Sequence, residues 1–163
     1  MNRLSLLSRS PLETEELGRR LGTLLEPGTF VALHGGMGSG KTCLTRGIVA
    51  AAAPESANLV ASPTFAIMNG YPGGTPVYHF DFYRLANSHE IAELGFEEYL
   101  EGNGICIVEW PERLGDLMPR ELLRVTLELA GDDERTLTIE AVGAVPEAIL
   151  GRFALLLEHE KIL

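Results

Sequence analysis

The stretch "FVALHGGMGSGKTCL", residues 30 to 44, runs from an apolar segment through four glycines to a lysine and a threonine. The segment 29 to 33 is typical of a short strand that is buried on both faces. Residues 41 to 53 place apolar side chains at helical spacing, and Pro54 ends the pattern. A strand, a glycine-rich loop and a helix in this order predict a protein of the α/β class.

The glycine-rich loop fits the pattern GxxxxGK[ST] from Gly35 to Thr42. Glycines let consecutive backbone N–H groups converge on an anion, and the N-terminus of the following helix adds positive charge. We therefore expect ATP with Mg²⁺ here, with Lys41 at the β- and γ-phosphates and the Thr42 hydroxyl on the metal. The alternative is an ordinary glycine-rich turn. The expected nucleotide-binding residues are Gly36, Met37, Gly38, Ser39, Gly40, Lys41, Thr42 and Cys43.

A nucleotide site of this kind needs a second acid for the metal, generally at the end of a neighbouring apolar strand. The segment "GICIVEW", residues 104 to 110, predicts a buried strand that ends at Glu109, so Glu109 is the expected metal ligand beside Thr42. Asp81, at the end of the strand pattern "VYHFD", competes for the metal or for orienting the attacking water. The alternatives are a solvated strand-end residue for Glu109 and an edge-strand carboxylate bonded to backbone amides for Asp81.

The rest of the chain supplies further helix and strand patterns. Ser10 and the proline and acid that follow predict a helix over 11 to 25. Residues 76 to 85 predict a strand whose aromatic side faces the core, and alternation over 123 to 141 predicts an antiparallel hairpin. A last helix is expected from Pro146. Further expected elements are a loop entering a strand over 62 to 71 and short helices over 88 to 94 and 96 to 100.

These elements predict a three-layer α/β fold like that of P-loop NTPases, with a mainly parallel central sheet extended by the antiparallel C-terminal hairpin. The length of 163 residues favours a single P-loop ATPase domain over residues 1–163. No apolar run approaches the roughly 20 residues of a membrane-spanning helix, so we expect a cytoplasmic protein without a membrane partner.

Charge and metal-binding residue types exclude several classes of function. The net charge is −10 and the chain has only two lysines, which disfavours direct, tight binding of RNA or DNA. The cysteines Cys43 and Cys106 lack the spacing of a metal site. The four histidines show no ligand spacing either, and we interpret them as packed or solvated residues.

Four segments in order, "GGMGSGKT", "SPTF", "YHFDFYRL" and "IVEWPERL", resemble the bacterial TsaE (YjeE) family of ATPases in tRNA threonylcarbamoyladenosine biosynthesis. The resemblance covers roughly residues 10 to 140. It implies a small ATPase that acts with TsaB and TsaD partners in threonylcarbamoylation of adenosine 37 in tRNAs that read ANN codons. The partners, rather than this acidic chain, would then contact the tRNA.

The resemblance also assigns roles to individual residues. Lys41 and Thr42 match the family residues that bind phosphate and Mg²⁺, and Glu109 is similar to the second Mg²⁺ ligand. Asp81 looks like the catalytic acid, and Thr64 of "SPTF" resembles a switch-like threonine that senses the γ-phosphate region. Asp81, Lys41 and Thr64 are therefore the expected catalytic residues.

Two departures from the family pattern concern the nucleotide. Gly36 and Met37 replace the commoner Asp-Leu, which leaves the anion nest intact. The hairpin turn is "GDDER" where a Gly-Arg pair is frequent, so Arg135 is only a weak candidate for an adenine or ribose contact. We expect slow hydrolysis by the isolated protein and stimulation by partners, because no arginine is securely placed to act on the γ-phosphate. Arg84 is the nearest candidate, and pairing with a carboxylate is its alternative role.

Two other classes of function share the phosphate-binding loop. A small-molecule kinase would also bind an acceptor and usually close a lid over it, but no arginine-rich lid segment is visible. A GTP-dependent switch commonly uses an Asn-Lys-x-Asp segment, which the chain lacks. A non-catalytic nucleotide-binding scaffold would bind Mg-ATP without partner-stimulated hydrolysis.

Overall fold

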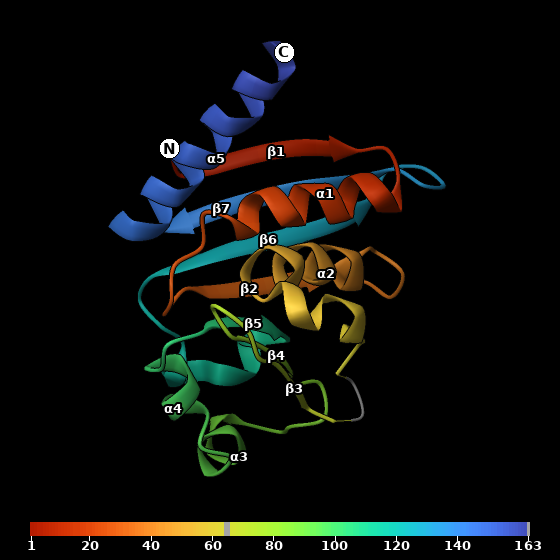
Figure 1. The fold of residues 1–163 in the computed structure, drawn as a ribbon. Helices are drawn as coiled ribbons and strands as arrows, with labels where there is room; N and C mark the ends of the chain where they lie inside the picture. The colour runs from red at the N-terminus through yellow and green to blue at the C-terminus, as the bar shows by residue number, and fades with distance from the viewer. Residues whose placement is uncertain (64–65, 163) are drawn as a thin grey trace.

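A computed structural model describes residues 1–63 and 66–162 and contains one seven-stranded sheet (Figure 1). The strand order across the sheet is β1-β7-β6-β2-β5-β4-β3. The bounds of the strands are β1 Arg3–Ser8, β2 Phe30–Gly35, β3 Met68–Tyr71, β4 Val77–Asp81, β5 Ile105–Glu109, β6 Leu122–Leu129 and β7 Arg135–Val142.

The centre of the sheet is parallel and both of its edges are antiparallel. Strand β2 lies between β5 and β6 and is parallel to both, and β4 joins β5 in parallel. Strand β3 pairs antiparallel with β4 at one edge, while β6, β7 and β1 form an antiparallel group at the other. The predicted parallel centre with a C-terminal antiparallel hairpin is thus confirmed. Strand β1 was not predicted, and its pairing with β7 extends that hairpin.

Helices cover both faces of the sheet and make three layers. Helices α1 (Pro11–Gly22), α2 (Lys41–Ala52) and α5 (Ala144–Ile162) contribute to one core cluster, which includes side chains from β2, β5, β6 and β7. Helices α3 (Ser88–Glu93) and α4 (Phe96–Leu100) and the 3-10 helix Pro111–Leu117 pack on the other face, against β2, β4 and β5. Another 3-10 helix, Pro54–Leu59, follows α2. The expected three-layer architecture is confirmed.

Helix α1 begins as the sequence predicts but ends three residues earlier. The Ser10 hydroxyl accepts a hydrogen bond from the backbone N–H of Glu13, 3.1 Å away, which caps the first turn. The helix ends at Gly22 rather than at residue 25. A Cβ atom at Gly47 of α2 would lie 2.0 Å from the carbonyl oxygen of Glu15 in α1. Glycine at this position therefore lets the backbones of α1 and α2 approach closely beneath the phosphate-binding loop.

Strand β4 is buried on both faces, although only its aromatic face was expected in the core. Phe80 and Phe82 pack with Phe96 in edge-to-face and tilted contacts, as predicted. His79 and Asp81 on the opposite face are also buried, with exposed fractions of 0% and 5%. Since β3 pairs on the outer side of β4, Asp81 does not lie on an edge strand.

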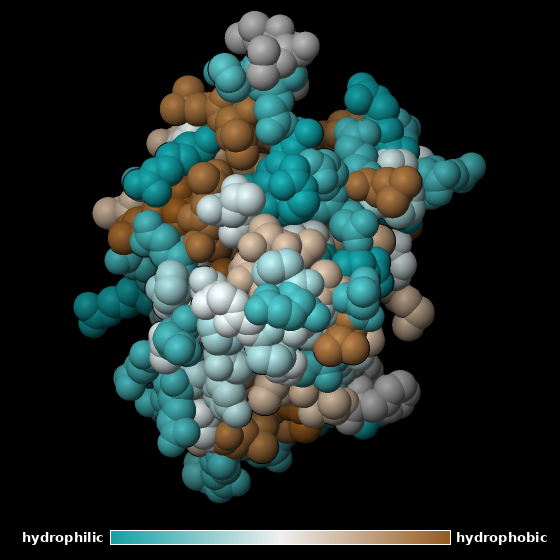
Figure 2. Space-filling view, viewed as in Figure 1, coloured by the Kyte–Doolittle hydropathy of each residue, from teal (hydrophilic) through white to brown (hydrophobic). Residues whose placement is uncertain are grey.

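The surface seen in Figure 2 is mostly polar, with apolar patches beside α5 at the upper left and at the lower end of the molecule. Exposed apolar residues of α5 include Val145 and Leu155. Among residues 1–63 and 66–162, no helix combines the length and apolar character needed to cross a membrane.

Candidate functional site

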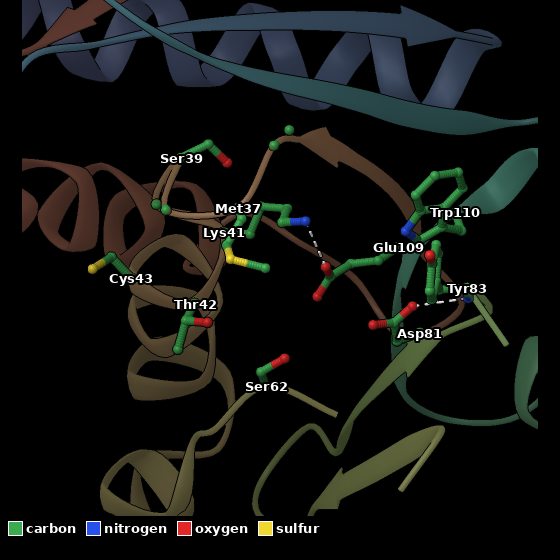
Figure 3. Close-up of a pocket in the computed structure, with 14 residues that line it drawn as sticks. Met37, Ser39, Lys41, Thr42, Cys43, Ser62, Asp81, Tyr83, Glu109 and Trp110 are labelled. Atoms are coloured by element: carbon green, nitrogen blue, oxygen red, sulfur yellow. Dashed lines mark hydrogen bonds and ion pairs between the residues drawn. The ribbon is translucent and has the colours of Figure 1, made fainter. Parts of the chain in front are cut away.

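The sheet brings the phosphate-binding loop, Glu109 and Asp81 to one place because parallel strands end at the same edge. The glycine-rich loop follows β2, Glu109 ends β5 and Asp81 ends β4, directly opposite Glu109 in the strand register. A cavity of about 710 Å³ opens between them (Figure 3). Its lining residues are Gly35, Gly36, Met37, Gly38, Ser39, Gly40, Lys41, Thr42, Cys43, Ser62, Asp81, Tyr83, Glu109 and Trp110.

The phosphate-binding loop owes its shape to glycine. Gly38 and Gly40 have φ values of 75° and 105°, a left-handed conformation that other residues adopt only with strain. Gly40 is the N-cap of α2 and provides no side chain to bond the first helical N–H groups, which have no acceptor within the helix. All eight residues predicted to bind nucleotide line the cavity. Met37 is fully exposed at the rim of this loop.

Lys41 and Glu109 form an ion pair at the base of the cavity. Lys41 Nζ lies 3.0 Å from Glu109 Oε1, and Figure 3 shows the two side chains meeting in front of the loop. Burial raises the pKa of Glu109, but hydrogen bonds and charge interactions with His79 and Lys41 outweigh burial and hold it below its ordinary value. The carboxylate is therefore ionised at neutral pH. The Glu109 carboxylate and the Lys41 ammonium are close enough to contact the same bound ligand.

The second oxygen of Glu109 contacts a buried histidine that sequence reasoning missed. His79 Nε2 lies 2.7 Å from Glu109 Oε2, and the His79 side chain has no exposed surface. Because a carboxylate only accepts, Nε2 carries the proton and donates it. The sequence predicts histidines that are packed or solvated. His79 is packed, and it also bonds the predicted metal ligand. Its alternation with Asp81 along β4 is the one sequence signal that places it on the same face.

Asp81 faces the cavity and is held by its own chain. The backbone N–H of Tyr83 donates to Asp81 Oδ1 over 2.9 Å, and the Asp81 carboxylate points toward the same space as Glu109 and the Thr42 hydroxyl (Figure 3). The expected bond to a backbone amide is thus present, together with a position on the cavity wall. The backbone therefore fixes the orientation of the Asp81 carboxylate, which lines the cavity where a ligand would bind.

Two aromatic residues and a serine complete the wall and were not predicted as site residues. Trp110 follows Glu109 with φ 58°, an uncommon left-handed value for a bulky residue. Its ring lies 5.0 Å from that of Tyr83 between centroids, and Arg113 stands 5.6 Å from the Trp110 centroid. Ser62 precedes "PTF", and its hydroxyl points into the cavity opposite Thr42 (Figure 3). The sequence signal for both aromatics is their nearness to the two acids, since Trp110 directly follows Glu109 and Tyr83 lies two residues after Asp81.

Three remaining candidates lie outside the cavity wall or outside the described residues. Arg135 donates from Nη2 to the carbonyl oxygen of Gly38 over 3.0 Å and from Nη1 to carbonyls of its own turn, so it ties the β6–β7 turn to the phosphate-binding loop. Arg84 is exposed and is not among the described residues that line the cavity. Thr64 lies outside the described residues.

Comparison with known proteins agrees with this arrangement. The family model "Threonylcarbamoyl adenosine biosynthesis protein TsaE" matches residues 8–137. The chain belongs to the TsaE family. A TsaE protein from Bacillus subtilis is 38% identical over 144 residues, which cover 88% of this chain and 89% of that protein. TsaE of Treponema pallidum is 34% identical over 133 residues, which cover 82% of this chain and 97% of that protein.

A solved structure shares the TsaE family fold of this chain. The crystal structure of YdiB from Bacillus subtilis superposes with a TM-score of 0.77 at 31% sequence identity. The match covers 93% of this chain and 94% of YdiB. The likeness therefore extends over most of both chains.

Proposed function

We propose that the protein binds and hydrolyses ATP as an accessory ATPase of tRNA threonylcarbamoyladenosine biosynthesis in the cytoplasm. The observation that carries the proposal is one cavity in which a phosphate-binding loop, the Lys41–Glu109 pair and Asp81 converge. The pathway comes from the printed names of the relatives, which are tRNA threonylcarbamoyladenosine biosynthesis proteins. The adenosine modified would be position 37 of ANN-decoding tRNAs, through a complex of the TsaB–TsaD type.

The residues present suit a triphosphate. A Cβ atom at Gly36 or Gly38 would meet nothing within 4 Å, so these positions border open space. The first N–H groups of α2 have no acceptor within the helix and are available as donors. The N-terminus of the helix also carries partial positive charge, so both features favour an anion here. The Lys41 ammonium pairs with Glu109 and would turn to a bound phosphate, which can accept charge-assisted hydrogen bonds from it.

The donor set also suits magnesium. Among residues 1–63 and 66–162, no three His, Cys, Asp or Glu side chains form a metal site by themselves. Mg²⁺ is usually held by one or two carboxylates together with substrate phosphates and water, so a complete protein cage is not required. Thr42 and Glu109 are the proposed ligands, and oxygen donors match the preference of this hard cation. When bound, Mg²⁺ would neutralise charge on the β- and γ-phosphates.

Asp81 is proposed to position the attacking water. The Tyr83 amide fixes one carboxylate oxygen, and Asp81 lines the cavity. A fixed carboxylate there can accept a proton from water or orient it in line with the γ-phosphate. Thr64 is proposed, on the resemblance alone, to sense the γ-phosphate.

Turnover by the isolated chain should be slow. The described residues that line the cavity include one cation, Lys41, and no arginine. An arginine that reaches the transferred phosphoryl group accelerates related reactions by roughly 10³–10⁵. We therefore propose that TsaB- and TsaD-like partners stimulate hydrolysis, with the tRNA bound by the partners.

Nucleotide binding is tested with Trp110, the single tryptophan, which lies on the cavity wall. We expect its emission to change on titration with Mg-ATP and Mg-ADP, and less with Mg-GTP. Lys41→Ala should weaken Mg-ATP binding by at least about tenfold, because one charge-assisted phosphate contact is lost. A folded wild type without any nucleotide response would refute the proposal.

A further inference from the structure

We infer that His79 is a positioning residue that holds Glu109 for the metal, an inference that rests on the proposed binding of Mg²⁺ and nucleotide. His79 is two residues before Asp81 on β4 and shares its face. It bonds Glu109 across the β4–β5 pair, a contact that was not predicted from the sequence. His79 does not line the cavity, so its action on a ligand runs through Glu109.

The two oxygens of Glu109 have different partners. Oε1 accepts from Lys41 at 3.0 Å, on the cavity side, and Oε2 accepts from His79 at 2.7 Å, on the buried side. Lys41 must turn toward phosphate when a nucleotide binds, which releases Oε1. We expect Oε2 to keep its bond, because His79 is fully buried and does not line the cavity. The released oxygen is then presented to Mg²⁺ from a carboxylate that cannot rotate freely.

The bond to His79 also accounts for a carboxylate that stays charged inside the protein. The Glu109 side chain is 7% exposed, so water contributes little to its solvation. The imidazole N–H supplies a donor that remains after Lys41 has left. His79 Nδ1 has no hydrogen-bond partner among the described residues. An apolar side chain at this position would pack without leaving a ring nitrogen unsatisfied. We therefore infer that His79 does more than fill space in the core.

The experiment separates the Mg²⁺ requirement from nucleotide binding itself. Trp110 emission reports ADP binding first in EDTA and then during a Mg²⁺ titration at fixed ADP. The test variant is His79→Leu, which removes the donor. The rescue variant is His79→Gln, whose side-chain amide can donate from about the position of Nε2. The matched control is Val77→Ala, a buried position on the same face of β4 that does not touch Glu109.

Loss of a residue that orients a metal ligand commonly weakens metal affinity by about 10–100-fold. We therefore expect His79→Leu to raise the Mg²⁺ concentration at half-maximal response about tenfold or more, with ADP affinity in EDTA within about twofold of wild type. His79→Gln should recover most of the loss, and Val77→Ala should lower Tm without shifting the Mg²⁺ requirement. In a Glu109→Gln background, His79→Leu should add no further shift.

Several outcomes would overturn the inference. His79 has a purely structural role if folded His79→Leu shows an unchanged Mg²⁺ requirement. The same conclusion follows if this variant loses ADP affinity in EDTA to an equal degree, or if its shift is additive in the Glu109→Gln background. If His79→Leu does not fold, His79→Asn replaces it, because its shorter amide does not reach Oε2, and the same shift is expected. If the wild type binds ADP with Mg²⁺ but the His79 variants behave otherwise than expected, only the inference about His79 fails. If the wild type binds no nucleotide, the inference and the proposed function both fail.

Discussion

Asp81 and Glu109 end neighbouring parallel strands in the same register, yet their surroundings differ. Glu109 is bonded by two side chains, Lys41 and His79, whereas Asp81 accepts from the backbone N–H of Tyr83. A carboxylate held between cationic or N–H donors remains ionised and suits a metal, and one held by a backbone amide has a fixed orientation that suits the positioning of water. The local contacts of the two acids therefore support different roles on one wall.

Asp81→Asn tests the role assigned to Asp81. The amide oxygen of asparagine can still accept from Tyr83 N–H, so the loop should keep its shape. We expect nucleotide affinity within a few-fold of wild type and hydrolysis in the presence of partners lowered by about 10²–10⁴. Phosphate release and Trp110 titration measure the two effects separately. Unchanged turnover would remove Asp81 from the chemical step.

The two cysteines should differ in reactivity. Burial raises the pKa of Cys106 to about 12, so its thiolate is scarce at pH 8, whereas Cys43 is half-buried at the cavity wall. A thiol reagent such as DTNB should therefore modify Cys43 in the native protein and leave Cys106 intact until denaturant is added. Mg-ADP should slow the reaction of Cys43, and Cys43→Ser is the control. Rapid native labelling of Cys106 would contradict the burial argument.

At the scale of elements, the contact between α1 and α2 sets the position of the phosphate-binding loop. Gly18 and Gly22 of α1 face the backbone of α2, and Gly47 of α2 faces the backbone of α1. Built Cβ atoms at all three positions come within 3.0 Å of main-chain atoms in the facing helix. Since α2 begins directly at Lys41, any separation of the two helices would displace the loop.

Gly47→Ala tests this packing, because its Cβ would lie 2.0 Å from Glu15 O and 2.7 Å from Arg19 N. Backbone atoms of a packed helix cannot rotate away as a flexible side chain can, so we expect the unfolding free energy to fall by about 1–3 kcal/mol. Gly151→Ala in α5 is the matched control, since its Cβ would meet nothing within 4 Å, and a gain of up to about 1 kcal/mol is expected. Denaturant melts measure both; equal stabilities would show that the helices can separate freely.

At the scale of the whole molecule, charge decides what the protein can approach. The net charge is −10, and acidic groups outnumber basic ones 23 to 13. A polyanion therefore meets mostly repulsion, while the loop, Lys41 and the helix end form a local site for phosphate. The proposed division of work, with ATP on this chain and tRNA on its partners, follows from that contrast.

Filter binding of unmodified tRNA tests the contrast. The isolated protein should bind more weakly than about 10⁻⁶ M at physiological salt, because few cations are available to displace counterions. Addition of TsaB- and TsaD-like partners should allow retention of tRNA by the complex. The control is the partner complex without this chain. Tight tRNA binding by the isolated protein would refute the assignment of tRNA to the partners.

Much of the fold could be predicted because its signals are local. The phosphate-binding loop, the buried run that ends at Glu109 and the alternating hairpin each lie within one short stretch, where spacing reports burial. Strand β1 escaped prediction because "RLSLLS" is short and mixed, and its strand character comes from pairing with β7, more than 120 residues away. The early end of α1 was missed because Leu24 and Leu25 continue the apolar pattern beyond Gly22.

The sequence by itself determined the residue types of the site: glycines that admit a bare backbone, one lysine, one threonine and two strand-end acids. Only the tertiary structure decided which of them touch. The order β2-β5-β4 sets Asp81 opposite Glu109, brings His79 to Glu109 Oε2 and packs Tyr83 against Trp110. Strand order and register bring together residues about 30 positions apart, and no local pattern encodes that pairing, because it depends on how the whole core packs.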